Sequence, residues 1–171
     1  MVVMKIYLAS DHAGFEFKNY IKDFLIKKGY DVEDCGPYVF DKNDDYPDFV
    51  SKAAEAVSKD PENSVGILAA NTGQAEAMLA NKYKNVRCAL FYAPAVAVGT
   101  VDVTGRKSTN PLEIINLARE HNNANMLSLS GKFMDIKTAE AVVELFLNTP
   151  FPGDERHVRR IEKIKKIEEH V

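Results

Sequence analysis

Two hydrophobic periods alternate along the chain, and this alternation constrains its fold more than any other feature. Short aliphatic runs are separated by longer stretches in which apolar residues recur at helical spacing. Phe17, Ile21 and Leu25, for example, fall on one helical face before Gly29 ends that helix. The alternation predicts an α/β fold in which crossover helices cover a parallel sheet. Strands are expected at residues 5–10, 31–35, 64–70, 87–92 and 125–130, and the later helices at residues 47–58, 74–83, 111–121 and 138–147.

The length and the charge of the chain limit what it can be. Its 171 residues are expected to form a single domain, residues 1–171, with a sizeable core. The 22 basic and 25 acidic residues give a net charge of -3, which offers no overall attraction for a nucleic-acid backbone or an anionic membrane. The most apolar stretch, residues 88–98, is well short of the roughly 20 residues that span a bilayer. We therefore expect neither nucleic acid nor membrane as a partner.

Neither the N-terminus nor the cysteines indicate export or metal binding. Residues 1–5 lack the charged region, long apolar stretch and cleavage site of a secretory signal, so a cytoplasmic protein is expected. Cys35 and Cys88 have neither CxxC spacing nor a neighbouring histidine cluster, which favours two reduced thiols. No metal and no other cofactor is expected.

Because ligands of open α/β sheets bind beyond the carboxyl ends of the strands, three loops are candidates for a site. The first, residues 10–14, contains Asp11, which could orient a group or take a proton, and His12, which could exchange protons near neutral pH. The alternative is that Asp11 caps a helix and His12 is simply exposed.

The second loop, residues 70–76, enters a helix whose free backbone N–H groups favour an oxyanion. Glu76 then lies in the first turns, where the alternative role of a carboxylate is to complement the helix dipole. The third region, residues 121–123, ends a helix with His121, and a histidine there is commonly only a favourable dipole partner.

Two arginines near the C-terminus form a fourth candidate. Arg156 and Arg160 are one helical turn apart and share a face, so their guanidinium groups could clamp a phosphate. The alternative is a solvated basic face paired with Glu155 and Glu162.

Residues 154–171 predict a C-terminal helix that needs a partner surface. On a segment made almost wholly of Arg, Lys and Glu, apolar residues recur at helical spacing: Val158, Ile161, Ile164, Ile167 and Val171. So narrow a stripe does not stabilise an isolated helix. We expect it to pack on another subunit.

These motifs, in this order, resemble the family of type B ribose-5-phosphate isomerases and galactose-6-phosphate isomerases along nearly the whole chain. The matching segments are SDHAGFEFK at residues 10–18, CG-Y and DYPDF ending at 49, GILAANTG at 66–73, ANK at 80–82, VRCAL at 86–90, LAREHNNAN at 117–125, and NTPF with ERHVRRIEKI at 148–164. So many matches in sequence make the resemblance specific.

The resemblance implies a three-layer α/β/α sandwich, with a five-stranded parallel Rossmann-like sheet in the order 2-1-3-5-4. It also implies an obligate homodimer, with a tetramer left open, and active sites at the subunit interface. The implied reaction is a metal-free aldose–ketose isomerisation of a sugar phosphate through an enediolate, which needs one base and one oxyanion cradle.

The chain departs from the family pattern in the loop that usually carries a catalytic cysteine. Ala70 stands at the cysteine position, and Asn71 and Ala75 replace two of the loop's glycines. One branch without the cysteine carries a glutamate four residues after the loop's Thr or Ser, and Glu76 stands at that distance from Thr72. The resemblance therefore makes Glu76 the expected base.

The other functional positions of the family also carry over. Catalytic roles are implied for Asp11, His12, Thr72 and His121, and substrate-binding roles for Tyr46, Asn71, Gly73, Asn122, Lys132, Arg156 and Arg160. The two arginines are expected to serve the partner's site. Lys132 replaces a family arginine, keeping the charge but losing the bidentate fork.

Residues 93–110 form an insertion relative to the family, about eighteen residues long, without sustained helical periodicity. Arg106 and Lys107 could approach an anion, so we expect a lid over the site, with a decorative loop as the alternative. The sequence as a whole favours an isomerase that interconverts ribose 5-phosphate and ribulose 5-phosphate. An isomerase of another four- to six-carbon sugar phosphate and a non-catalytic sugar-phosphate-binding subunit are the alternatives.

Overall fold

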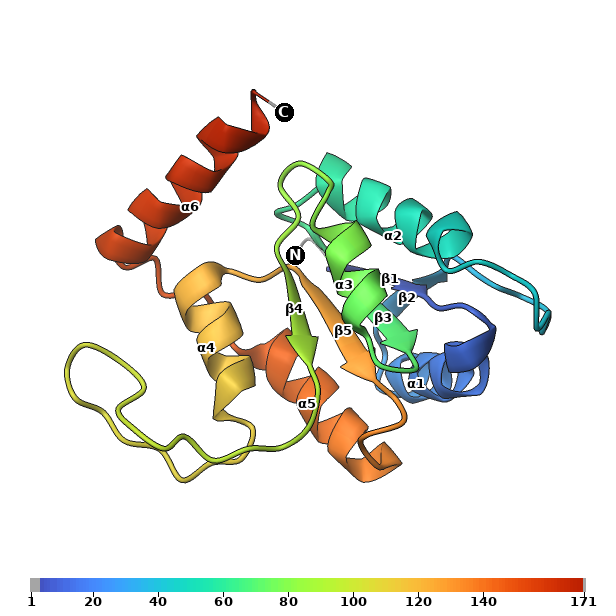
Figure 1. Ribbon diagram of the computed structural model, residues 1–171, viewed down its shortest axis with the longest axis horizontal. Helices are drawn as coiled ribbons and strands as arrows, with labels where there is room; N and C mark the ends of the chain where they lie inside the picture. The colour runs from blue at the N-terminus through green and yellow to red at the C-terminus, as the bar shows by residue number, and fades with distance from the viewer. Residues whose placement is uncertain (1–3, 171) are drawn as a thin grey trace.

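A computed structural model describes residues 4–170, and its centre is a parallel sheet of five strands (Figure 1). The strand order is β2-β1-β3-β5-β4, which confirms the expected fold class and topology. The strands are β1 (Lys5–Ala9), β2 (Asp31–Asp34), β3 (Ser64–Ala70), β4 (Cys88–Phe91) and β5 (Met126–Ser130). Met1, Val2, Val3 and Val171, which entered the expectations on export and on the C-terminal stripe, lie outside the described residues.

Helices cover both faces of the sheet and make the three layers. One apolar cluster joins the sheet to α1 (Phe15–Lys27), α4 (Glu113–Asn122) and α5 (Ile136–Asn148), and the other joins it to α2 (Pro47–Lys59) and α3 (Gln74–Ala80). Every residue of β3 and of β5 is buried. These two strands therefore form the centre of the core, as continuous apolar runs in parallel sheets usually do.

The expected element boundaries hold to within a few residues, and one difference has a clear cause. Helix α3 ends at Ala80 instead of near Tyr83. Asn81 follows it, and its side-chain amide donates to the Cys88 carbonyl oxygen at 3.0 Å while its Oδ1 accepts the Cys88 N–H at 2.8 Å. The side chain of Asn81 thus ties the end of the helix to β4. No helix among residues 4–170 is both long and apolar enough to cross a lipid bilayer.

The last helix, α6 (Glu155–Glu168), stands beside α4 at the edge of the molecule (Figure 1). Ile161 is buried against the body, whereas Val158, Ile164 and Ile167 are exposed. Part of the apolar stripe is therefore uncovered in a single chain.

Residues 93–110 contain no helix or strand and form the long yellow-green loop of Figure 1. Arg106 fixes this loop to α4: its guanidinium group contacts carboxylate oxygens of Asp102 at 2.9 Å, Glu113 at 2.7 Å and Glu120 at 3.4 Å. Because Glu113 and Glu120 lie near the two ends of α4, Arg106 ties the loop to both ends of that helix. Arg106 is paired with three carboxylates, and its approach to a bound anion stays a prediction.

Candidate functional site

The loops that follow β1, β3 and β5 are packed together at the carboxyl end of the sheet. A Cβ at Gly14, in the 3-10 turn η1 (His12–Gly14), would lie 2.0 Å from the Ala69 carbonyl oxygen, so only a glycine permits this approach. The Gly131 N–H donates to the Ala70 carbonyl oxygen at 2.8 Å. These contacts join three strand ends into one surface, at the edge where ligands bind in open parallel sheets.

Asp11 is the N-cap of the turn η1. Its Oδ1 accepts the N–H groups of Ala13 at 2.9 Å and of Gly14 at 3.3 Å. The capping role considered from the sequence is therefore confirmed. The other oxygen, Oδ2, lies 3.9 Å from His12 Nδ1, which is beyond hydrogen-bonding distance.

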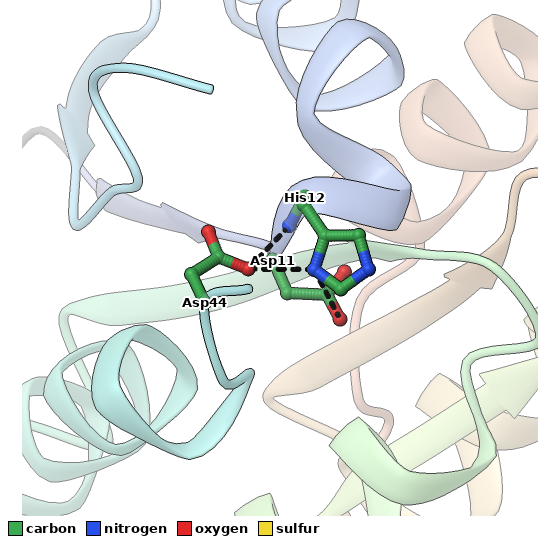
Figure 2. Close-up of side chains that lie close together, drawn as sticks. All are labelled: Asp11, His12 and Asp44. Atoms are coloured by element: carbon green, nitrogen blue, oxygen red, sulfur yellow. Dashed lines mark hydrogen bonds and ion pairs between the residues drawn. The ribbon is translucent and has the colours of Figure 1, made fainter. Parts of the chain in front are cut away.

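Asp44 is the closest partner of His12, as Figure 2 shows. Its Oδ1 accepts the His12 backbone N–H at 2.8 Å and lies 2.8 Å from His12 Nδ1. The hydrogen bond from Asp44 raises the pKa of His12, and the charge of Asp11 adds to this effect. No motif in the sequence singles out Asp44, because an acidic run in a polar loop is ordinarily a solvated surface.

Glu76 lies in the first turn of α3 and is almost completely buried, with 6% of its surface exposed. Burial raises the pKa of its carboxyl group above the ordinary value of 4.5, and the negative charge of Asp11 raises it further. A carboxyl group so placed is a better proton carrier near neutral pH than an exposed one.

The turn before Glu76, residues 71–73, is fixed by Gly73. Gly73 has a φ of +75°, which favours glycine, and its carbonyl oxygen accepts the Ser128 hydroxyl at 2.7 Å. The backbone N–H groups of Thr72 and Gly73 donate to no acceptor within residues 4–170. They remain available to an oxyanion.

Asn71, Tyr46 and Lys132 lie at the same end of the sheet. The Asn71 carbonyl oxygen accepts the Lys132 N–H at 3.2 Å, which places Lys132 beside the turn, with its side chain exposed. Tyr46 precedes α2 and is half-buried against the core cluster that includes Ala9 at the end of β1. The structure therefore brings Asp11, His12, Tyr46, Asn71, Thr72, Gly73, Glu76 and Lys132 to one end of the sheet, which we call the acidic half-site.

His121 and Asn122 lie at the opposite end of the sheet. They end α4, and the Arg87 guanidinium group, just before β4, donates to the Asn122 carbonyl oxygen at 3.0 Å. The expectation that residues 121–123 join the first two loops at the carboxyl ends is therefore wrong. The reason is topological, because a connection from a helix into a parallel strand lies at the amino end of that strand.

Arg156, Arg160, His121 and Asn122 form a second cluster, the basic half-site. His157 organises it: its ring is 2% exposed and stacks on His121 with the centroids 4.4 Å apart, and its Nε2 lies 3.0 Å from Arg156 Nε. Burial lowers the pKa of His157, and the neighbouring positive charges lower it further, so its neutral ring accepts a hydrogen bond from the Arg156 guanidinium group. No role for His157 was expected from the sequence.

The loop of residues 93–110 reaches this second cluster. A pocket of about 240 Å³ is lined by residues 100–103 of the loop together with His121, Arg156, His157 and Arg160. The tip of the loop therefore lies over the basic half-site of its own chain, although the loop leaves the sheet at the carboxyl end of β4.

One group of side chains has a spacing that suits a metal ion. Among residues 4–170, ligand atoms of Asp11, His12 and Asp44 lie within 4.8 Å of one another. Oδ1 of each aspartate already accepts two hydrogen bonds from protein groups. In this arrangement, these carboxylate oxygens therefore act as hydrogen-bond acceptors.

Comparison with known proteins identifies the family. The profile of the ribose/galactose isomerase family matches residues 6–104 and 109–164. The chain belongs to the ribose/galactose isomerase family. Among its relatives in that family, the ribose-5-phosphate isomerase B of Mycolicibacterium paratuberculosis is 37% identical over 165 residues, which cover 96% of this chain and 92% of that protein.

Solved structures of the ribose/galactose isomerase family share the fold. Ribose-5-phosphate isomerase B from Mycoplasma genitalium, solved with bound ribulose-5-phosphate, matches over 100% of both chains with a TM-score of 0.85 and 37% identity. The Clostridium thermocellum enzyme matches over 98% of this chain and 99% of that chain, with a TM-score of 0.81 and 35% identity. The resemblance seen in the sequence is confirmed, and the chain is an aldose–ketose isomerase of the type B kind.

Proposed function

We propose that this enzyme interconverts ribose 5-phosphate and ribulose 5-phosphate, with Glu76 as the base. The observation that carries the proposal is the buried Glu76 carboxyl group, with its raised pKa, beside a turn with free backbone N–H groups. The ribulose-5-phosphate bound by the Mycoplasma genitalium relative supports the choice of sugar.

The reaction needs only a proton carrier and a cradle for negative charge. In the opened aldose, the Glu76 carboxylate takes the proton from C2, the C1 carbonyl oxygen gains negative charge, and an enediolate forms. Glu76 then returns the proton to C1 while the O2 proton is lost and O1 gains one, which gives the ketose. In this proposal the N–H groups of Thr72 and Gly73 stabilise the oxyanion, a contribution that strengthens as charge develops.

The phosphate end of the substrate requires a second copy of the chain. The acidic half-site holds the base and an exposed lysine, Lys132, but no arginine among residues 4–170, whereas Arg156 and Arg160 lie at the other end of the same subunit. We propose a homodimer in which the basic half-site of one protomer, with His121 and Asn122, completes the acidic half-site of its partner. The exposed apolar residues of α6 supply a surface for this pairing.

Isotope exchange tests the role of Glu76. In deuterated water the wild-type enzyme should exchange the reacting proton of ribose 5-phosphate while it isomerises the sugar. Glu76→Gln keeps the shape of the side chain and removes its basicity, so kcat should fall roughly 100-fold or more with exchange and turnover lost together, while KM changes little. Exchange that persists in Glu76→Gln would assign the base to another residue.

A different sugar phosphate is the second candidate, because the loop tip over Arg156 and Arg160 changes the pocket where a phosphate would bind. Turnover of four- to six-carbon aldose and ketose phosphates, measured with a chelator present, distinguishes the two candidates. A kcat/KM for another sugar above that for ribose 5-phosphate would favour the second. The expected cytoplasmic location and the expected independence of cofactors remain predictions.

A further inference from the structure

The loop between β2 and α2, residues 35–46, is anchored to the body and carries Asp44 at its far end. The Lys18 ammonium group, which is completely buried, contacts the Asp34 carboxylate at 2.6 Å and donates to the Pro37 carbonyl oxygen at 2.7 Å. Farther along, the ring of Phe40 packs edge-on against Phe15, with the centroids 6.0 Å apart. The loop is therefore fixed before it reaches His12.

The Asp44 carboxylate is buried, and among residues 4–170 its hydrogen-bond partners are both groups of His12. Its side chain is 8% exposed, its Oδ1 takes both contacts from His12, and its Oδ2 is buried without a hydrogen-bond donor among residues 4–170. In Figure 2, Oδ2 points away from the His12 ring. Burying a charged oxygen without a partner is costly, and proteins tolerate such groups where they serve a function.

The geometry fixes how His12 can act. With Asp44 accepting at Nδ1, the proton on Nδ1 is held by the carboxylate, and Nε2 is left as the position that can meet a ligand. The His12 side chain is 36% exposed, and its Nε2 has no hydrogen-bond partner among residues 4–170. A buried carboxylate against Nδ1 also favours the imidazolium form, in which Nε2 carries a proton as well.

We propose that Asp44 is a positioning residue that holds His12 as a cationic hydrogen-bond donor, with Nε2–H directed at an oxygen of the bound sugar phosphate. The inference rests on the proposed function, and it gives Asp11 and Asp44 different roles. Asp11 caps the turn, whereas Asp44 sets the orientation and the charge of His12. Two charged groups face the ring, Asp11 from its own turn and Asp44 from the loop. The charge of Asp11 also acts on Glu76 of α3.

The test variant is Asp44→Asn, and Asp48→Asn is its control. The asparagine keeps an oxygen for the His12 N–H and loses only the charge, whereas Asp48 is an exposed residue at the start of α2 whose side chain makes no hydrogen bond among residues 4–170. Asp44→Asn should lower kcat/KM roughly tenfold at pH 8, mainly through KM, and Asp48→Asn should leave it unchanged. The deficit should shrink at pH 6, because there His12 becomes protonated without Asp44.

Titration of His12 by NMR tests the role of Asp44 independently of the substrate and of the catalytic base. In the free enzyme, the pKa of His12 should fall in Asp44→Asn and stay in place in Asp48→Asn, whichever sugar the enzyme uses. In a His12→Asn background, Asp44→Asn should cost no further activity. An unchanged His12 titration, or a deficit of the same size at every pH, would overturn the proposal even if Glu76 proves to be the base. If Asp44→Asn unfolds, Asp44→Glu, which keeps the charge, should fold and retain the raised pKa.

Discussion

The acidic and basic half-sites differ in charge and in the way the fold holds them. The acidic half-site is made of loops and of the first turn of α3, and hydrogen bonds from backbone N–H groups fix Asp11 and the adjacent Asp44. The basic half-site is made of two helix ends, and its members are fixed by stacking and by one contact between Arg156 and His157. One subunit carries both, at opposite ends of the sheet.

This difference suggests that proton transfer and phosphate binding are assigned to two parts of the fold with different rigidity. Proton transfer needs atoms held to a fraction of an ångström, and tight turns against strand ends supply that precision. Binding a phosphate needs positive charge and reach, which long side chains on a helix supply without exact placement. A half-site that lacks the complementary charge is incomplete by itself, so the comparison predicts that function depends on pairing.

Mixing two impaired variants is the strongest test of whether the two half-sites of one active site come from different subunits. Glu76→Gln and Arg160→Ala alone should each have low activity. Random exchange of subunits should place one intact acidic half-site beside one intact basic half-site in half of the dimers, restoring about a quarter of wild-type kcat. The measurement is turnover of ribose 5-phosphate after co-refolding, with separately refolded variants as the control. No gain on mixing would place both half-sites of one active site in a single chain.

Removing one arginine should have the next largest effect. Arg160→Ala should lower kcat/KM roughly 30-fold, which corresponds to about 2 kcal/mol of lost transition-state stabilisation, because the phosphate loses a hydrogen-bonded cation. Arg159→Ala removes an exposed charge from the same helix outside the pocket, so it should change kcat/KM little. Equal losses in the two variants would mean that the general charge of α6, and not a clamp, attracts the substrate.

The smallest expected effect is on stability, and its sign follows from burial. Because folding raises the pKa of Glu76, the favourable contribution of this group is present below its ordinary pKa of 4.5 and is lost as the pH rises through the folded value. Glu76→Gln should therefore melt a few degrees above the wild type at pH 8 and at the same temperature near pH 4. Thermal denaturation at the two pH values checks this, and a variant that is less stable at pH 8 would contradict it.

Most of the fold could be predicted from the sequence, because its determinants are local. The apolar runs of β3 and β5 and the helical face of Phe17, Ile21 and Leu25 follow from periodicity alone. The end of α3 could not be predicted, because Asn81 ends it through a contact with Cys88, seven residues away.

The site was less predictable, because its partnerships join distant loops. The position of Glu76 after Thr72 is a local signal, and the structure places it in a buried first turn as expected. The partner of His12 lies 32 residues away on a loop without periodicity, so no spacing rule identifies Asp44. The stack of His157 on His121 is likewise a contact between two helices, and only packing reveals it.

The way Arg106 anchors residues 93–110 has a consequence for how much this segment can vary. Among residues 4–170, the hydrogen bonds and ion pairs of residues 93–110 all run within residues 95–120, to the loop itself or to α4. The segment brings its own counter-charges and uses none of the bonds that hold the sheet together. Because such a segment is self-contained, its length can change while the strand register stays the same. Natural variation among close relatives is therefore expected to concentrate there, and a deletion variant in which a short linker joins the end of β4 to α4 should still fold.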